Sequence, residues 1–386
     1  MNALSARTVD SVAAVEAAAW DACLPGEAEC HAYYSACEAT ASASGVGLRM
    51  AAAIVEERGR VVAVAPLFRL SYRLDTPLQG RLRGLGEALF RRLPGLLTLK
   101  ALCVGSPYAE RCHLGFSPGL DAAGRAEALR LLIAALQRQA AAEGTQLVVW
   151  KDLAPAQEQE AAGPLAQAGF ARLASLPVAV LDLPFRDEAG YLASLSAATR
   201  KDIRRKLAKA GAVRIEFRSD IAGLEAQIDA LYESTRARSG LDYGDLEVLP
   251  PGYFAAVARA LGERAVFVLY WIGPELAAFN LLLLEADRVV DKFLGMRYPL
   301  AREHNLYVVS WMANIRFCMA RGIGLFQSGQ TAYASKLRFG SRLVPSAIHV
   351  RHRSRPLQWA LRRASPWLGF DRFDPDLAEG AGRKAA

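Results

Sequence analysis

The sequence contains few of the residue patterns that mark metal-binding or disulfide-stapled proteins. Its six cysteines include no C-x-x-C pair. Cys23, Cys30 and Cys37 follow one another at seven-residue steps, but Pro25 and Gly26 interrupt any helix that would place the three thiols on one face. We therefore expect small buried thiols and no metal.

Long hydrophobic runs and a leader sequence are also missing. No stretch reaches the ~18 uninterrupted apolar residues that a membrane span needs, because Asn280 and Arg316 cut the longest candidates. The N-terminal segment carries Asp10 and Glu16 and has no apolar centre of the signal-peptide type. These absences predict a cytoplasmic protein whose thiols stay reduced.

What is present is an ordinary globular composition with a basic excess. Of the 386 residues, 52% are apolar and 22% are charged, which excludes a disordered chain. At ~150 residues per domain, this length predicts two domains. The 47 Lys and Arg against 39 Asp and Glu give a net charge of +8, which suits phosphates, anionic lipid headgroups or nucleic acid. No RRM, KH or helix-turn-helix pattern accompanies the basic residues, so we expect no dedicated nucleic-acid binding.

Strands and helices are expected to alternate along the whole chain. The first half predicts a hairpin over 47–70, an extended stretch over 97–104, a helix over 122–143, a strand over 146–150, a helix over 156–168 and a strand over 176–183. The second half predicts a helix over 189–210, a strand over 213–217, a helix over 220–238, a three-stranded meander over 265–296, a buried helix over 306–321, a strand over 323–327, a short helix over 331–338 and a strand over 343–352.

The two halves share one order of elements: hairpin, strand, helix, strand, short helix, strand. Gly169 before the last strand of the first half also matches Gly340 before that of the second. We interpret this agreement as an ancient duplication. The alternative is that two α/β halves acquired the same order of elements and turn residues by convergence. The predicted domains are residues 1–185, structural or acceptor-binding, and the catalytic residues 186–353, followed by a basic tail over 354–386.

The loop before the buried helix is a candidate anion site. Arg297, Arg302 and His304 precede the helix start, where backbone N–H groups have no partner within the helix. Asn305 stands at the N-cap position. The alternative is therefore a capped helix preceded by a solvated loop.

A second candidate is the glycine-bearing loop that follows strand 323–327 and includes Gln330. Ligands of parallel sheets bind at the carboxyl ends of the strands, and this loop leaves such an end. Tyr333 and Lys336 lie three residues apart, on neighbouring faces of the short helix. The alternative is that Tyr333 packs in the core and Lys336 is solvated.

The run from Asn305 to Arg353 resembles the C-terminal half of FemAB-type and related GNAT-like N-acyltransferases, often described as BioF2-like or CelD-like acetyltransferase domains. The basic segment 195–211 is similar to the helix that opens the same domain. This resemblance implies an α/β fold of two tandem GNAT-like domains with mixed sheets. The family pattern is a helix with a central Trp, a glycine joint, a glycine loop and a Y/F-x-x-K-x-x-x-G helix end, supplied here by Trp311, Gly322, Gly329, Tyr333, Lys336 and Gly340.

The resemblance also implies a reaction, namely transfer of an acyl or aminoacyl group to an amine of a small or lipid-linked molecule, such as a cell-envelope or polysaccharide precursor. Tyr333 would protonate the leaving group and Asp291 would act as the base, unless Asp291 is held in a salt bridge. A backbone N–H of strand 289–296 would stabilise the oxyanion. The donor would be bound by Arg297, Arg302, His304, Asn305, Gln330, Lys336 and Arg338.

One departure from the family leaves the donor open. The loop before the buried helix lacks the Q/R-x-x-G-x-G/A signature with which ordinary GNAT enzymes hold coenzyme A. An acyl-CoA such as acetyl-CoA and an aminoacyl-tRNA are therefore both candidates. The alternative function is a non-catalytic GNAT-like module that binds an anionic lipid-linked or polysaccharide intermediate.

Basic charge is concentrated in two segments. Residues 200–214 carry seven basic side chains and one acid, and residues 336–363 carry eight Lys and Arg and no acid. Each predicts a phosphate-binding face or a solvated one. In residues 78–93, leucines at helical spacing among arginines predict either a helix on an anionic bilayer, at the inner face of the membrane, or a lid packed on the core.

Overall fold

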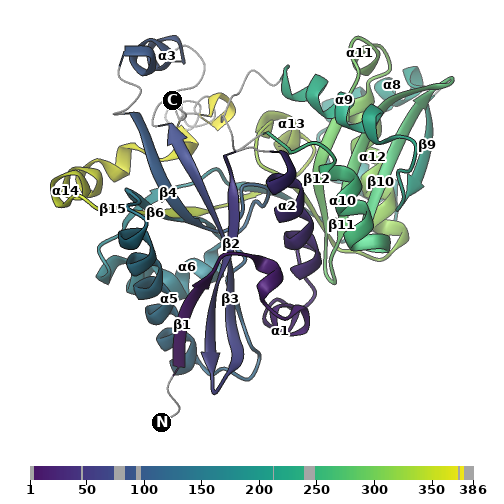
Figure 1. Cartoon of the computed structure of the whole chain (residues 1–386). Helices are drawn as coiled ribbons and strands as arrows, with labels where there is room; N and C mark the ends of the chain where they lie inside the picture. Colours follow the sequence, from purple (N-terminus) through teal and green to yellow (C-terminus); the bar gives the residue numbers. More distant parts are fainter. Residues whose placement is uncertain are drawn as a thin grey trace. The chain divides into compact units, whose positions relative to one another are not determined.

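The chain forms two compact units in the computed structural model (Figure 1). The first unit contains the described residues up to Pro177, residues 248–250 and those from Val344 onward, and the second contains the rest. The structure describes residues 4–44, 47–73, 83–92, 97–211, 213–238, 248–372 and 374–377.

A mixed sheet in the order β1-β2-β3-β4-β6-β15-β7 is the base of the first unit, with β5 paired to β3. β4 and β6 run parallel to each other, and the other neighbours run antiparallel. The strands are β1 (Leu4–Val9), β2 (Arg49–Glu57), β3 (Arg60–Arg73), β4 (Thr98–Val104), β5 (Gly115–Phe116), β6 (Leu147–Leu153), β7 (Ala171–Ala174) and β15 (Ala347–His352).

Helices cover both faces of this first sheet. Figure 1 shows α5 and α6 on one side of β2 and β3, and α1 and α2 on the other. Alternate residues of a strand point to opposite faces, and Ala51, Ala53 and Val55 pack in one core with Leu129 and Leu132 of α5. The helices are η1 (Val12–Ala14), α1 (Ala17–Cys23), α2 (His31–Ser44), α3 (Arg83–Arg92), α5 (Ala122–Ala142), α6 (Pro155–Gln167), α14 (Arg355–Ala364), η5 (Ser365–Trp367) and η6 (Phe370–Arg372).

The second unit has a sheet in the order β14-β8-β13-β12-β11-β10-β9. β12 and β13 run parallel, whereas β9 to β12 form antiparallel neighbours and β8 runs antiparallel to β13. The strands are β8 (Val178–Asp182), β9 (Val213–Arg218), β10 (Ala265–Ile272), β11 (Glu275–Leu284), β12 (Val289–Met296), β13 (Leu325–Gly329) and β14 (Arg342–Val344).

Two different cores cover the second sheet. On one side, the buried helix α12 packs with Val268, Tyr270 and Leu282 of the sheet. Elsewhere, aromatic rings of α9 and α10 meet rings of the strands, with Phe254 and Phe279 5.1 Å apart between centroids. The helices are α7 (Glu188–Ser194), α8 (Ala197–Lys209), α9 (Glu225–Arg236), α10 (Tyr253–Leu261), η4 (Gly262–Arg264), α11 (Leu300–Glu303), α12 (Leu306–Ala320) and α13 (Tyr333–Arg338).

The strand that ends each half of the sequence belongs to the sheet of the other half. β8 pairs with β13 in the second unit, and β15 pairs with β6 and β7 in the first. Pro177 separates β7 from β8, and Pro345 separates β14 from β15, because proline cannot donate a hydrogen bond to a ladder. The units therefore change over at residues 177–178 and 343–344, and not at the predicted 185 and 353.

Most other predicted elements are present with small shifts at their ends. The predicted helix over 189–210 is two helices, because the Ser196 hydroxyl accepts a hydrogen bond from the Thr199 N–H at 3.2 Å and starts α8 afresh. The predicted basic tail begins with helix α14. Of the leucine and arginine segment, residues 83–92 form α3, and residues 78–82 lie outside the described residues.

The six cysteines are buried, as expected, and none of them forms a disulfide. Burial raises the pKa of the Cys103 and Cys112 thiols to about 12, so neither is a thiolate at neutral pH. Within the described residues, no three His, Cys, Asp or Glu side chains gather in a way that would hold a metal ion. No described helix is both long enough and apolar enough to cross a membrane.

Gly295 on β12 provides a test of the packing in the second unit. A Cβ atom at this position would lie 2.8 Å from the backbone nitrogen of Tyr232 in α9. We expect Gly295→Ala to lower the free energy of unfolding by about 1–3 kcal/mol, because the helix backbone has to move away from the strand.

The matched control is Gly324→Ala, because no heavy atom lies within 4 Å of its added Cβ. It should change stability by less than about 1 kcal/mol. Urea unfolding of the two variants checks the prediction, and equal stabilities would contradict it.

Candidate functional site

The parallel strands β12 and β13 pair over a very short distance. Their ladder joins Val289 to Phe326 and Val290 to Gln327, and it has no further pair among the described residues. Beyond Val290, the N–H groups of β12 that face away from β11 do not enter a ladder with β13. The two strands thus leave an open edge inside the sheet, at the carboxyl end of both.

A β-bulge lies just past this point of divergence. The register between β11 and β12 shifts so that Leu281 pairs with Phe293 and Leu282 with Asp291, which leaves Lys292 as the extra residue. Lys292 is nevertheless buried. Further along, the N–H of Met296 donates to the Thr235 hydroxyl of α9 at 2.7 Å, so α9 holds the end of the diverging strand.

Asp291 is held between two buried asparagines. Its carboxylate accepts hydrogen bonds from the Asn280 amide at 2.8 Å and from the Asn314 amide at 3.2 Å. Both amide groups are donors here, which suits an ionised carboxylate. Burial, and then the charge of Asp291, raise the pKa of the Cys318 thiol to about 12. Asp291 therefore links β11, β12 and α12 through amides.

The loop after β13 has an unusual backbone. Gly329, Thr331 and Ala332 have φ angles of 81°, 62° and 49°. Left-handed φ values are costly for a β-branched residue such as Thr331, so the surroundings must hold the loop in place. One such contact is made by Lys336, whose buried ammonium donates to the Gln330 carbonyl at 2.8 Å.

Helix α13 is anchored to the core of the second unit through Trp311, the central tryptophan of the motif. The Trp311 indole N–H donates to the Tyr191 hydroxyl at 3.0 Å, and that hydroxyl donates to the Phe339 carbonyl at 2.8 Å. Burial raises the pKa of Tyr191, so the hydroxyl keeps its proton. Tyr333, at the first position of α13, is fully buried.

The predicted anion site before α12 is only partly assembled. Asn305 occupies the N-cap position with φ at 53°, but its side chain makes no capping hydrogen bond. Arg297 is paired with Glu275 at 2.9 Å, whereas the guanidinium of Arg302 lies 6.0 Å from the centre of the Tyr298 ring. His304 closes the short helix α11 by donating its N–H to the Leu300 carbonyl.

Arg338 contributes to a different cluster, on the basic helix α8. Its guanidinium contacts Asp202 at 2.7 Å, and Arg205 and Lys206 contact the same carboxylate at 2.7 and 2.9 Å. Hydrogen bonds from Lys206 and Arg205 hold the pKa of Asp202 well below its usual range. This cluster ties α13 to α8, while Arg204 stays exposed.

The structure therefore brings together only some of the predicted catalytic and donor-binding residues. Gln330 and Lys336 lie in contact, whereas Arg297, Arg338 and Asp291 each have partners of their own. Sequence reasoning missed the two asparagines around Asp291 and the hydroxyl that holds Met296. An asparagine inside an apolar strand and another inside an apolar helix were the available signals.

Comparisons with known proteins agree with this geometry. Residues 197–337 match the family model of the acetyltransferase (GNAT) domain. The second unit contains a GNAT domain. The match supports acyl transfer as the class of reaction, and it confirms the predicted GNAT-like character of this unit. No curated relative is similar enough in sequence to count as a match.

Solved structures show the fold over most of the chain. One of them is the C-terminal domain of an Agrobacterium fabrum protein described as a lysylphosphatidylglycerol synthetase. It has 12% identity and a TM-score of 0.54, with 89% of this chain and 92% of that one covered. FemX has 15% identity and a TM-score of 0.53, with 84% and 92% covered. A tandem GNAT protein of the clavulanic acid pathway has 14% identity and a TM-score of 0.51, with 91% and 98% covered. The predicted FemAB-like fold of two tandem GNAT-like domains is confirmed.

The amide contacts of Asp291 lead to a prediction about stability. Asp291→Ala leaves two buried amide groups without their acceptor, and each unsatisfied group costs about 1–3 kcal/mol. We expect the variant to lose about 2–4 kcal/mol of unfolding free energy.

Asp287→Ala is the matched control, since Asp287 is an exposed carboxylate on the turn between β11 and β12. It should stay within about 0.5 kcal/mol of the parent. Both variants are measured by denaturant unfolding. An Asp291→Ala protein as stable as the control would show that the asparagines find other partners.

Proposed function

We propose that the second unit transfers an acyl or aminoacyl group from a thioester or a tRNA ester to an amine. The observation that carries the proposal is the divergence of β12 from β13 after two residue pairs. It frees backbone N–H groups at one point of an otherwise closed sheet, next to the loop that Lys336 holds. Donors of this kind can stabilise the oxygen that becomes negative when an acyl carbon is attacked.

The proposed step forms one bond and breaks one. The amine nitrogen attacks the acyl carbon, and the bond from that carbon to sulfur or oxygen then breaks. Tyr333 gives its hydroxyl proton to the departing atom, and Asp291 accepts the proton that the amine loses. The asparagine contacts support this assignment of Asp291, because they hold its carboxylate in a fixed position on β12.

The contacts of the predicted donor-binding residues support different roles for them. Arg302, His304 and Asn305 stand at the start of α12 and are assigned to the donor's phosphate groups. Lys336 is assigned to positioning, because its ammonium bonds to the Gln330 carbonyl. The acceptor is proposed to be an amine on a small or lipid-linked molecule of the cell envelope.

Tyr333→Phe tests the assigned proton donor. Loss of a general acid should lower turnover by ~10²- to 10⁴-fold, because the proton is needed only as charge develops on the leaving atom. Donor affinity should hardly change. Steady-state kinetics and direct binding of the donor separate the two effects.

Lys336→Met is the companion variant, since it removes the contact to the loop and keeps a side chain of similar length. It should weaken donor binding first. If Tyr333→Phe turns over as fast as the parent protein, Tyr333 only packs in the core. If the parent protein itself shows no turnover with any donor, the non-catalytic anion-binding module is favoured.

A panel of donors tests the first step of the proposal. A ligand at 100 times its dissociation constant raises the unfolding free energy by ~2.7 kcal/mol. We expect a rise in melting temperature either with acetyl-CoA and desulfo-CoA, which carry the same phosphate groups, or with a tRNA in its aminoacylated and uncharged forms. No shift with any donor would contradict acyl transfer.

A further inference from the structure

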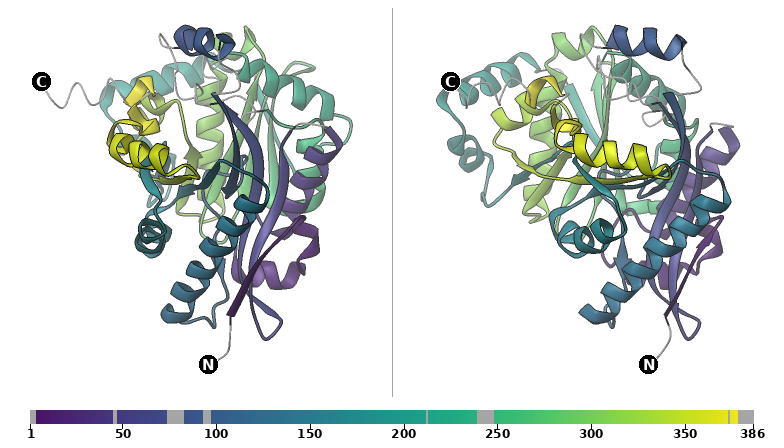
Figure 2. Two further views of the ribbon diagram at one scale, coloured as in Figure 1. Left: turned by 60° about the vertical axis from the view of Figure 1, so that its left-hand side comes forward. Right: turned by 90° about the vertical axis from the view of Figure 1, so that its left-hand side faces the viewer.

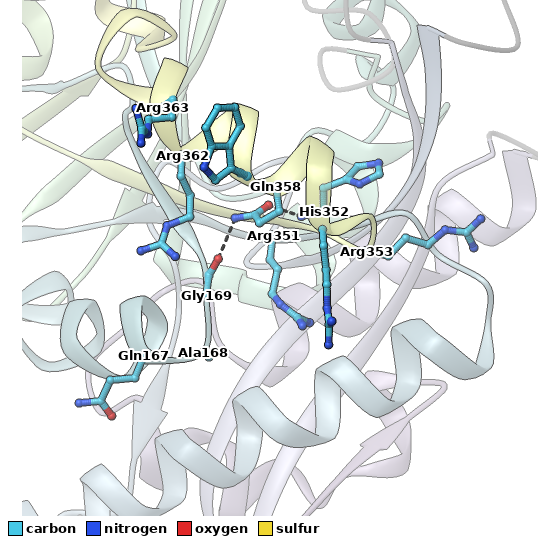
Figure 3. Close-up of a pocket in the computed structure, with 11 residues that line it drawn as sticks. Gln167, Ala168, Gly169, Arg351, His352, Arg353, Gln358, Arg362 and Arg363 are labelled. Carbon is cyan, nitrogen blue, oxygen red and sulfur yellow. Dashed lines mark hydrogen bonds between the residues drawn. The ribbon is translucent and has the colours of Figure 1, made fainter.

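The first unit carries a surface groove with a strongly basic lining. The groove has a volume of about 550 Å³ and lies between the end of α6, the strand β15 and helix α14. No acidic side chain from the described part of the chain lines it. Figure 3 shows Arg351 and Arg362 extending to either side of Gly169. Its basic lining residues are Arg351, His352, Arg353, Arg355, Arg362 and Arg363.

The guanidinium groups of this groove have no carboxylate partner within the described residues. Some arginines elsewhere in the first unit are paired, such as Arg7 with Glu56 at 2.9 Å and Arg69 with Glu143 at 2.7 Å. Here Arg353 donates to the Gly144 carbonyl, and Arg363 lies 5.0 Å from the centre of the Trp359 ring. Five positive charges within thirteen residues repel one another, so an anionic partner would stabilise this surface.

Helix α14 is fixed in place although none of its residues is buried. The Gln358 amide donates to the Gly169 carbonyl at 2.7 Å, and its oxygen accepts from the His352 N–H at 2.6 Å. Figure 2 shows α14 lying on the outside of the first unit, in front of its sheet in the right-hand view. The basic groups are therefore presented to solvent on an ordered helix.

Large apolar side chains are exposed in the same stretch. Trp359 and Trp367 are 62% and 65% exposed, and Leu357 is 56% exposed. Of the seven large hydrophobic residues exposed among the described ones, four lie within residues 357–368, the fourth being Leu368. Exposed apolar groups beside arginines indicate an interaction surface. Tryptophan and arginine together are typical of the boundary between water and lipid.

We propose that residues 351–368 dock the protein on an anionic lipid bilayer, with the arginines at the headgroup phosphates and Trp359, Trp367 and Leu368 at the acyl boundary. A nucleic acid would pair with the arginines and stack on the tryptophans but would leave Leu368 in water. The bilayer accounts for both kinds of side chain. This surface differs from the leucine and arginine segment 78–93, and the inference does not depend on acyl transfer.

The test is flotation of the full chain with phosphatidylcholine vesicles that either contain or lack phosphatidylglycerol. We expect binding to the anionic vesicles only. The double variant Arg355→Glu with Arg362→Glu should bind more than about tenfold less tightly, because each basic residue near an anionic surface contributes to the affinity.

The matched control is Arg60→Glu with Arg138→Glu, which changes the net charge equally at exposed positions outside the surface. It should bind within about twofold of the parent. Equal losses in the two double variants would overturn the proposal, because they would show a response to net charge alone. Absence of binding, or equal binding to uncharged vesicles, would also overturn it.

A second variant tests the apolar part. Trp359→Ala with Trp367→Ala should lower the binding that remains at high salt, since burial of apolar surface is not screened. Unchanged binding would overturn the docking geometry. Release of the protein by inorganic phosphate at matched ionic strength would instead indicate a free-phosphate site. Tighter binding of tRNA than of vesicles to the same residues would indicate a nucleic-acid surface, and either result would overturn the proposal.

Discussion

The short ladder between β12 and β13 is the constraint on which the rest of the second unit depends. Two residue pairs hold the strands together, and from Val290 onward they separate. Each nearby feature deals with that separation: the bulge at Lys292 bends β12, Thr235 satisfies the N–H of Met296, and Lys336 holds the loop that leaves β13. A continuous ladder would remove the free N–H groups and with them the candidate oxyanion site.

The buried polar contacts explain how an apolar unit keeps this opening in one geometry. Helix α12 has apolar side chains nearly all round, so dispersion and burial alone would allow it to slide or turn on the sheet. The hydrogen bonds from the Asn314 amide to Asp291 and from the Trp311 indole to Tyr191 can each form in only one position of α12 on the sheet. Such contacts contribute little net stability when made, but breaking them leaves a buried group unsatisfied. They therefore specify the position of α12 and, through Phe339, of α13.

Much of the architecture was accessible from local patterns. The meander, the buried helix and the short helix after strand β13 followed from hydrophobic periodicity and from glycine and proline punctuation. The pairing of the last strands was not accessible. The apolar residues of β8 and β15 indicate that each strand is buried, but a buried strand can complete either of two similar sheets. Helix α14 was likewise hidden in a segment whose basic composition suggested a tail.

The sequence by itself determined the α/β class, the repeated order of elements and the basic excess of the C-terminal segment, because these follow from residues near one another in the chain. Only the tertiary structure decided which charges are neutralised. Arg297, Arg338 and Arg362 look alike in the sequence, yet the first two meet carboxylates and the third meets none among the described residues. The reason is physical: ion pairs and amide contacts join residues far apart in sequence, so the partner of a side chain depends on how the whole unit folds.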